Sequence, residues 1–520
     1  MNGAESLLRS LAREGIEICF MNPGTSEMQF VAAVDRVAGI RCVLGLFEGV
    51  VSGAADGYAR MAGKPASTLL HLGPGLANAL ANFHNARRAG SPIVNIIGEH
   101  ASYHRECDPP LHSDIDGLAR YVSDWVRMVA TADDIACATQ EAVRAATGPP
   151  GRITTLIIPA DCSWNEAGDH VPASSGRQQQ PAFEDSVISR CIQALQSSDP
   201  VAIILDGAAL RGEGLGLAAK IREHCGAGIF CDCFVPRVER GAGRPAITSI
   251  PYLPDMALRL LSQYKHAILV GAREPVGFFA YPGVPNKYLP AGCQIIRAAG
   301  PEGDLIGVLS AIADGLGAGI IKTPVQEYQY SAPPTGKLDV PAMDCVLAAL
   351  IPENAIIVDE AVTGSIGLMA ATARSRPHDW LFNTGGALGA GMPLATGAAL
   401  ACPDRRVVSL EADGSGMYSP QALWTQARES LNITTIVYAN REYRILNIEH
   451  QRVGAGAPGS KATDMMSLDR PELDWVQLAQ GMGIPAQRVT TADEFNRVLE
   501  NYLQEPGPNL IEAQVEPLVI

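Results

Sequence analysis

Two oxygen-bearing side chains follow two neighbouring predicted strands. Asp413 comes directly after the apolar run VVSLEA, and Asn440 comes directly after ITTIVYA. In a right-handed βαβ unit the two parallel strands lie side by side and end at the same edge of the sheet. We therefore expect both side chains to lie in the crevice where open α/β sheets bind ligands. Such oxygen ligands suit a hard ion such as Mg²⁺, although a turn aspartate and a turn asparagine of any α/β protein would give the same spacing.

The segment between these strands has the features of a phosphate-binding turn. Gly414 and Gly416 allow a close approach of backbone to a ligand. A helix is predicted to begin near SPQALW, with Ser419 as its N-cap and Pro420 in its first turn. Free backbone amides and the helix dipole favour an anionic group such as a phosphate at this position.

The same segment resembles the signature of thiamine-diphosphate-dependent enzymes, which opens with Gly-Asp-Gly and closes with Asn. The resemblance is carried by ADGSGMYSPQALWTQAR and NITTIVYAN. It implies that Mg²⁺ is held by Asp413, the Asn440 side chain and the Glu442 carbonyl. It also implies that Gly414 and Ser415 lie along the diphosphate of the cofactor.

Two positions depart from that signature. Ala412 replaces its first glycine, and Arg441 replaces the residue that usually follows the closing asparagine. Ala412 removes no ligand, and Arg441 either adds a cation near the phosphate or points to solvent.

A glutamate near the front of the chain matches the second half of such a site. The stretch CVLGLFEGVVSGAADGYARMAGKPA resembles the glutamate segment of the family. By this resemblance Glu48 hydrogen-bonds the aminopyrimidine ring of the cofactor and moves its proton. On its own, Glu48 would also fit an acid in the first turn of a helix, where the helix dipole favours it.

Further motifs are closest to the group of benzoylformate decarboxylase, acetolactate synthase and pyruvate oxidase. NPGTSEMQF places Thr25 at an active-site serine, and LLHLGPG places His71 at a catalytic histidine, although His71 alone could be a buried structural residue. NTGGALGAG resembles the cofactor-supporting loop, which implies a Gly386 carbonyl that accepts from the 4′-amino group and a Leu388 side chain beneath the cofactor. His112 falls near paired active-site histidines of pyruvate decarboxylases.

The implied reaction is the non-oxidative decarboxylation of a 2-oxo acid, with the product released as an aldehyde or joined to a second carbonyl as a 2-hydroxy ketone. The middle segment REPVGFFAYPG lacks the second histidine of benzoylformate decarboxylase, and Ile445 and Glu449 replace residues of its aryl pocket. Glu449 would face either that pocket or water. Alternatives are a catalytically silent or regulatory paralogue of the same fold and a flavin-dependent 2-oxo acid oxidase. A nicotinamide dehydrogenase is disfavoured because LDGAALRGEGLG imitates its glycine motif poorly.

Strand-like and helical patterns alternate almost from end to end, which predicts an α/β protein. Polar stretches rich in Pro, Ser and Gln divide the chain into three doubly wound parallel-sheet domains. We predict a pyrimidine-binding domain at 1–166, a central α/β domain at 185–318 and a diphosphate- and Mg²⁺-binding domain at 336–520.

The totals restrict the class of partner. The net charge is −15 with no dense basic run, which argues against nucleic acid and anionic membranes as partners. No signal peptide or membrane-spanning run is visible, and the 12 cysteines show neither zinc nor disulfide spacing, so we expect a cytoplasmic protein. The resemblance further implies a homodimer or homotetramer in which Glu48 of one chain and Asp413 of another share a site.

Overall fold

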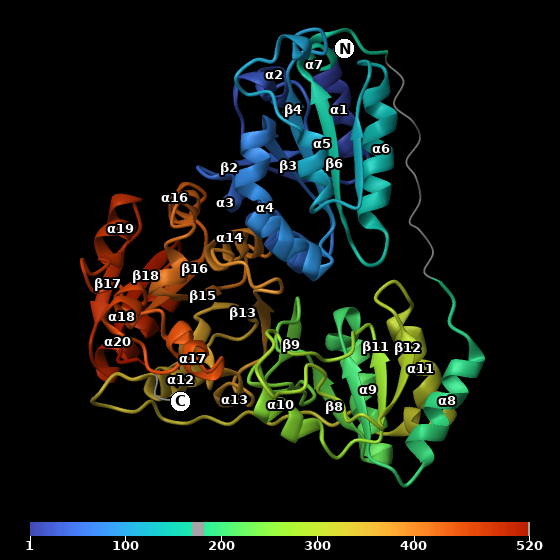
Figure 1. Cartoon of the computed structure of the whole chain (residues 1–520), viewed down its shortest axis with the longest axis vertical. Coiled ribbons are helices and arrows are strands. Elements are labelled where there is room, and N and C mark those ends of the chain that lie inside the picture. The colour runs from blue at the N-terminus through green and yellow to red at the C-terminus, as the bar shows by residue number, and fades with distance from the viewer. Residues whose placement is uncertain (169–180, 518–520) are drawn as a thin grey trace.

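The protein is described by a computed structural model covering residues 1–168 and 181–517. It forms three α/β domains, each built on its own sheet (Figure 1). Figure 1 shows the first domain standing above the third, with the central domain beside the third. The predicted fold class is confirmed, while the domain boundaries drawn from the sequence stay a prediction.

The first sheet has six parallel strands in the order β2-β1-β3-β4-β6-β5. Helices α1 and α6 cover one face, and α3, α4 and α5 cover the other. The strands are β1 Ile18–Asn22, β2 Arg41–Leu44, β3 Ala66–His71, β4 Ile93–Glu99, β5 Trp125–Met128 and β6 Ile153–Pro159. The helices are α1 Gly3–Arg13, α2 Met28–Val34, α3 Glu48–Ala62, α4 Leu72–Ala89, α5 Ile115–Arg120, α6 Asp134–Thr147 and α7 Ala160–Trp164, with short 3₁₀ turns η1 Thr25–Glu27 and η2 Arg105–Cys107.

The central sheet has five parallel strands in the order β10-β8-β7-β11-β12. Its strands are β7 Val201–Leu205, β8 Gly228–Cys231, β10 Thr248–Ser249, β11 His266–Val270 and β12 Gln294–Ala299. Its helices are α8 Asp185–Gln196, α9 Gly212–Cys225, α10 Pro254–Leu261 and α11 Leu305–Leu316, with 3₁₀ turns η3 Gly207–Leu210 and η4 Ala318–Ile320.

The third sheet has seven strands in the order β17-β18-β16-β15-β13-β14-β9. The strands are β9 Val238–Arg240, β13 Ala355–Glu360, β14 His378–Phe382, β15 Val407–Ala412, β16 Ile433–Ala439, β17 Ala486–Val489 and β18 Asn509–Gln514. The helices are α12 Val340–Leu350, α13 Leu368–Ala371, α14 Gly391–Ala401, α15 Asp413–Gly416, α16 Ala422–Arg428, α17 Arg444–Arg452, α18 Ser460–Met465, α19 Trp475–Gly481 and α20 Ala492–Gln504, with a 3₁₀ turn η5 Val362–Ser365. Strand β9 comes from the predicted central range, yet it pairs with β14 and is antiparallel, unlike every other described pairing in the three sheets.

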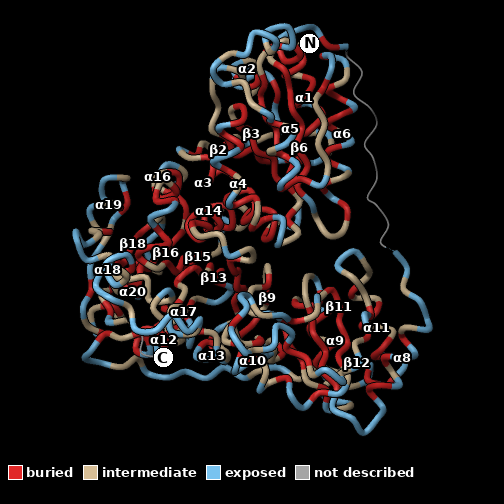
Figure 2. The backbone as a smooth tube through the Cα atoms, viewed as in Figure 1, coloured by how far each residue is buried: buried red, intermediate tan, exposed pale blue. Residues whose placement is uncertain are grey.

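The first and third domains meet through helices α3 and α14, which are buried along most of their length (Figure 2). A Cβ added at Gly57 would lie 2.0 Å from the Leu394 carbonyl oxygen, and one at Gly397 would lie 1.9 Å from the Ala54 carbonyl oxygen. The two helices therefore pack closely only because these positions are glycine. This packing brings the start of α3, where Glu48 stands, to the loop before α14.

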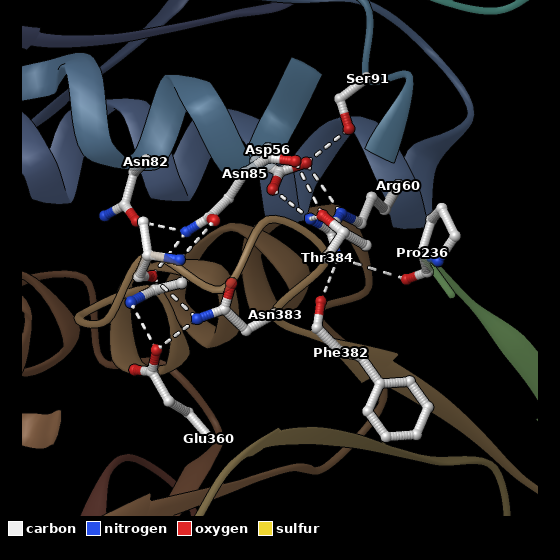
Figure 3. A network of polar contacts seen from close by, with 12 residues as sticks. Asp56, Arg60, Asn82, Asn85, Ser91, Pro236, Glu360, Phe382, Asn383 and Thr384 are labelled. Atoms are coloured by element: carbon white, nitrogen blue, oxygen red, sulfur yellow. Dashed lines mark hydrogen bonds and ion pairs between the residues drawn. The ribbon is translucent and has the colours of Figure 1, made fainter. Parts of the chain in front are cut away.

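Arg60 on α3 joins all three domains (Figure 3). Its guanidinium pairs with Asp56 on the same helix and donates to the Phe382 carbonyl at 2.6 Å and to the Thr384 hydroxyl at 3.1 Å. It also donates to the Pro236 carbonyl of the central range at 3.3 Å. A buried charge is tolerated here because nearly every donor of the guanidinium has an acceptor.

Candidate active site

The carboxyl ends of β15 and β16 lie side by side, as the βαβ argument predicts. The two strands pair in parallel with Ala412 opposite Tyr438. The backbone amide of Arg441 donates to Asp413 Oδ2 at 2.6 Å, and that of Gly414 donates to Oδ1 at 2.9 Å. Asn440 Oδ1 accepts from the Glu442 amide at 3.0 Å. The sequence separation between Asp413 and Asn440 thus becomes direct proximity at one sheet edge.

Asp413 is buried, with 3% of its surface exposed. Burial raises the pKa of its carboxyl to about 6, although the amides of Arg441 and Gly414 act in the opposite direction. A divalent cation beside these oxygens would favour the charged form. A carboxylate, an amide oxygen and a backbone carbonyl are the ligands that Mg²⁺ prefers. The predicted donors Asp413, Asn440 and Glu442 therefore fit a magnesium ion chemically.

The turn after β15 is held by its small residues. A Cβ at Gly414 would lie 2.4 Å from the Tyr443 ring, so glycine lets the two strand-end loops touch. Ser415 Oγ donates to the Glu360 carbonyl at 3.0 Å and accepts from the Ala412 amide at 3.2 Å. Gly414 and Ser415, the residues predicted to lie along the diphosphate, therefore both belong to the same buried turn.

The expected N-cap role of Ser419 is wrong. Helix α16 begins later, at Ala422, without a side-chain cap. The Ser419 hydroxyl instead donates to the Gly389 carbonyl at 2.8 Å, because the chain turns toward the loop before α14. Ser419 thus connects the Asp413 turn to that loop.

Glu48 is the first residue of α3 and is 9% exposed. Its Oε2 accepts from Asn78 Nδ2 at 3.0 Å. The next residue is tied to the third domain, because Asn82 Nδ2 donates both to the Gly49 carbonyl at 2.7 Å and to the Gly389 carbonyl at 3.1 Å. The Gly389 carbonyl therefore accepts from Asn82 on the Glu48 side and from Ser419 on the Asp413 side.

The loop that carries Gly386 and Leu388 is clamped at the residue between them. Asn85 donates to the Ala387 carbonyl at 2.8 Å and accepts from the Ala387 amide at 3.1 Å. Asn383 donates to the same carbonyl at 2.8 Å and accepts from the Gly386 amide at 3.0 Å (Figure 3). Gly386 adopts a positive φ of 74°. The loop is therefore fixed from both domains at Ala387, between the two predicted cofactor-supporting residues.

Two buried glutamates lie beneath this loop. Glu360 accepts from the amides of Gly389, Ala390 and Gly391, the last at 2.8 Å, and from Asn383. Glu411 stands opposite it in the β13–β15 register. Burial is the main cause that raises the pKa of Glu360 to about 7 and the pKa of Glu411 well above its usual value. We assign the negative charge to Glu360, because its amide donors stabilise a carboxylate.

The sequence reasoning missed both of these glutamates. The available signal was a charged residue inside each of two apolar strands, AIIVDE and VVSLEA. A buried acid needs a partner, so such a residue predicts a neighbouring acceptor or donor, although not its identity.

His71, at the end of β3, is positioned by another acid, Glu27, which the sequence reasoning also missed. Glu27 Oε2 lies 2.9 Å from His71 Nδ1 and accepts from the Gly24 amide at 2.8 Å. Burial is the main cause that raises the pKa of Glu27, and the facing His71 opposes it. Thr25, in the same η1 turn, is exposed. The signal for Glu27 was an acid two residues after Thr25 in the quoted loop NPGTSEMQF.

His112 lies near His71, because its neighbour Ser113 packs against the turn that follows His71. Ser113 packs against Gly73, where an added Cβ would lie 2.0 Å from the Ser113 hydroxyl oxygen. His112 Nδ1 lies 3.4 Å from Asp108. The 112–113 segment therefore borders the turn that follows His71.

Three of the strand ends carry strained backbone. Leu72, Val362 and Arg441 have positive φ values of 53°, 55° and 63°. Each follows a strand of the proposed site, namely β3, β13 and β16. Side-chain-bearing residues hold such angles only where their surroundings enforce them, and such strain clusters at functional sites. The three positions therefore follow strand ends that carry residues of the proposed site, one in the first sheet and two in the third.

Residues 1–168 and 181–517 contain no group of three His, Cys, Asp or Glu side chains that could hold a metal ion. The proposed magnesium donors are instead one carboxylate, one side-chain amide and one backbone carbonyl. Glu48 lies on one side of the Gly386–Gly389 loop, and the Asp413 turn lies on the other. The chemical groups on the two sides are of the types that thiamine diphosphate and Mg²⁺ would need.

Comparison with known proteins agrees with this arrangement. Residues 1–120 match the family model described as "Thiamine pyrophosphate enzyme, N-terminal TPP binding domain", and residues 363–513 match its C-terminal TPP binding domain. The chain is 49% identical, over 100% of both sequences, to a Mycobacterium tuberculosis protein named as an acetolactate synthase large subunit, IlvX. It is 30% identical to the benzoylformate decarboxylase of Pseudomonas aeruginosa over 98% of both sequences.

A solved structure is also similar. The thiamine diphosphate-dependent 4-hydroxybenzoylformate decarboxylase of Rhodococcus jostii RHA1 superposes with a TM-score of 0.83 at 25% identity, covering 99% of both chains. The two family models leave residues 121–362, which include the whole central sheet, unmatched.

Proposed function

The chain belongs to the thiamine pyrophosphate enzyme family, and from this premise we propose that it uses thiamine diphosphate and Mg²⁺ to decarboxylate a 2-oxo acid. The names of its relatives, acetolactate synthase and benzoylformate decarboxylase, support this class of reaction. The product leaves as an aldehyde or is joined to a second carbonyl compound.

The third domain would hold the charged end of the cofactor. Asp413, the Asn440 side chain and the Glu442 carbonyl would bind Mg²⁺, and Gly414 and Ser415 would lie along the diphosphate. The hydrogen bond from the Arg441 amide to Asp413 Oδ2, 2.6 Å long, supports this assignment because it fixes the two strand-end loops relative to each other.

The first domain would supply proton transfer. Glu48 would hold and move a proton at the aminopyrimidine ring. In the third domain, the Gly386 carbonyl would accept from its amino group and Leu388 would support the cofactor. When bound, the cofactor would provide the nucleophile for the substrate carbonyl and the electron sink for the loss of CO₂.

The loops around His71 would face the substrate. His71, held by Glu27, would donate or accept a proton at the substrate, with Thr25 and His112 beside it. Glu27 would act as a positioning residue, because its carboxylate fixes the tautomer and orientation of the imidazole ring.

One observation carries the proposal. The Gly389 carbonyl accepts hydrogen bonds from Asn82 and from Ser419, which link it to the Glu48 helix and to the Asp413 turn. The Glu48 helix and the Asp413 turn are therefore both hydrogen-bonded, through Asn82 and Ser419, to the loop that carries Gly386 and Leu388.

A panel of aliphatic and aromatic 2-oxo acids, with and without aldehyde acceptors, tests the proposal. Purified protein with thiamine diphosphate and Mg²⁺ is expected to release CO₂ from at least one acid, and product analysis separates aldehydes from 2-hydroxy ketones. Asp413→Ala serves as the control, because it should lose Mg²⁺-dependent cofactor binding in calorimetry. Absence of thiamine diphosphate binding by the unaltered protein would refute the proposal.

We also propose where the protein acts and how it assembles. Twelve free cysteines and the acidic composition support a cytoplasmic protein that acts on a small molecule. In the described parts of the chain, no helix is both long and apolar enough to span a bilayer. A homodimer or homotetramer with shared sites is our proposal for the assembly.

A further inference from the structure

Helix α17 follows the proposed metal loop directly and carries no fully buried side chain; its Ile445 and Ile448 are half-buried. It runs from Arg444 to Arg452, and none of its nine residues, all of them described, is buried. A short helix without a buried face is marginally stable by itself. Contacts made by its polar side chains therefore contribute to its position beside those of its half-buried isoleucines.

A carboxylate on α17 binds two tyrosines of the central domain. Tyr281 donates to Glu449 Oε2 at 2.7 Å, and Tyr252 donates to Glu449 Oε1 at 3.0 Å. Each carboxylate oxygen thus has its own hydroxyl donor. Glu449 is half-buried, which disfavours open water, while its place in an aryl pocket stays a prediction. We call Glu449, Tyr252 and Tyr281 the carboxylate latch.

A cation one turn later strengthens the same contact. Arg452 lies 3.2 Å from Asp255 on α10, and its guanidinium carbon lies 5.8 Å from the centre of the Tyr281 ring. Hydrogen bonds to charged groups are stronger than those between neutral groups. Burial and the facing carboxylate raise the pKa of both latch tyrosines, so their hydroxyls remain donors.

The latch continues into an aromatic cluster that reaches the cofactor-supporting loop. Tyr252 packs against Phe234 and Phe278, with ring centres 6.0 and 5.8 Å apart. The Phe278 ring lies on Gly386, where an added Cβ would be 2.5 Å from the ring. Side chains of the central domain therefore contact both α17 and the loop that carries Gly386 and Leu388.

We propose that the central domain positions helix α17, and through it the metal loop, by means of the carboxylate latch. Glu449, Tyr252 and Tyr281 are then positioning residues, and the central domain acts on the site although neither family model covers it. The consequence for cofactor binding rests on the proposed function, whereas the positioning of α17 does not.

Amide hydrogen exchange in the cofactor-free protein tests the positioning. The double variant Tyr252→Phe/Tyr281→Phe removes both donors and keeps both rings. We expect amide exchange across 444–452 to accelerate at least about tenfold, because each lost hydrogen bond to a carboxylate weakens docking. Tyr264→Phe is the matched control, since Tyr264 is a tyrosine of the central domain that packs on Phe230 in that domain's own core. Unchanged exchange in the double variant would overturn the proposal.

Variants of the carboxylate separate the latch from a general loss of packing. Glu449→Ala should accelerate exchange as much as the double variant, and combining the two should add little further. Glu449→Gln should restore part of the protection, because an amide can still pair with the hydroxyls. The latch would be contradicted if the effects of Glu449→Ala and of the double variant on amide exchange were fully additive. It would also be contradicted if Glu449→Gln restored no protection.

The effect on the proposed function is read separately by calorimetry. A loosened α17 must be ordered when the cofactor binds, so the double variant is expected to bind thiamine diphosphate and Mg²⁺ several-fold more weakly, with the Tyr264→Phe protein unchanged. If the unaltered protein binds no thiamine diphosphate, the proposed function fails while the exchange result still stands. Equal affinity with accelerated exchange would refute the coupling of the latch to the metal loop.

Discussion

Glu48 is the single residue on which the proposed proton transfer depends most directly. Its carboxylate stands at the start of α3, where Asn78 holds one oxygen. We expect Glu48→Gln to lower turnover by about 10²–10⁴-fold, the usual contribution of a positioned acid–base group. Thiamine diphosphate binding, measured by calorimetry, should persist because in the proposed site the third domain holds the diphosphate and the metal.

Glu17→Gln is a suitable control, because the Glu17 side chain is 55% exposed and its partners are Lys64 at the surface and the Tyr58 hydroxyl at 3.4 Å. Its turnover should match the unaltered protein. Near-normal turnover of Glu48→Gln would remove the acid–base role from this residue.

The sequence predicted those site residues whose position follows from chain geometry. Asp413 and Asn440 could be placed together because parallel strands end at a common edge. Glu27 and Glu360 could not be placed, because their roles depend on contacts with His71 and with the Gly389–Gly391 amides across the fold. A periodic pattern identifies strands but does not identify which side chains meet across them.

The loop between β14 and α14 is the element whose geometry the site needs most. Asn85→Asp would place a carboxylate oxygen against the Ala387 carbonyl, where the amide now donates. Asn383 would still donate to that carbonyl, but because Asn85 is 1% exposed, setting a buried carboxylate against it in place of a donor should cost about 1–3 kcal/mol. A lower unfolding midpoint in calorimetry is the expected result.

Asn501→Asp makes the same chemical change at an exposed position of α20 and should leave the midpoint nearly unchanged. If Asn85→Asp behaved like this surface variant, the clamp on Ala387 would not stabilise the loop.

Helix α12 carries a buried acid that predicts a pH dependence of stability. Burial, followed by the charge of Asp359, raises the pKa of Asp344 to about 7. Its folded pKa therefore exceeds the unfolded value of about 3.9, so its stabilising contribution is complete below that value and is lost as pH rises through about 7. In Asp344→Asn this loss is absent, and the variant should gain unfolding temperature relative to the parent between pH 5 and pH 8.

Thermal unfolding at several pH values checks this expectation. The exposed Asp314 on α11 provides the control, since Asp314→Asn should shift the midpoint equally at every pH. A constant difference between Asp344→Asn and the parent protein from pH 5 to pH 8 would count against a raised pKa at this site.

Element prediction succeeded where hydrophobic runs were long and failed where they were short or polar. Strands β15 and β16 were recognised from the continuous apolar runs VVSLEA and ITTIVYA. The three-residue strand β9 and the strand β14, which begins with His378 and Asp379, gave no such run. Ser419 was assigned to a cap because its local sequence allows one, but the Gly389 carbonyl is its tertiary partner.

At the scale of the whole molecule, the open question is whether one site uses two chains. The described chain packs its own α3 against its own Gly386–Gly389 loop. The family resemblance implies instead that Glu48 and Asp413 of one site come from different chains. Mixing subunits that carry Glu48→Gln with subunits that carry Asp413→Ala distinguishes the two arrangements.

Shared sites predict restored activity in the mixture. In a mixed dimer, one site would combine both defects, and the other would contain an unaltered Glu48 and an unaltered Asp413. Turnover should then rise well above either variant alone, after the two are unfolded and refolded together. Sites built within one chain would give no restoration, because each chain would keep its own defect. Light scattering of the same samples establishes that mixed oligomers have formed.

Strand β9 determines how the central domain can be exchanged between relatives. It belongs to the central range in sequence but forms the outer strand of the third sheet, with Val238 opposite Trp380. A chimera that replaced the central domain without a matching strand would leave β14 as an open edge, ready to pair with another molecule and aggregate. Recombination of this domain is therefore expected to succeed only when the donor sequence supplies its own closing strand.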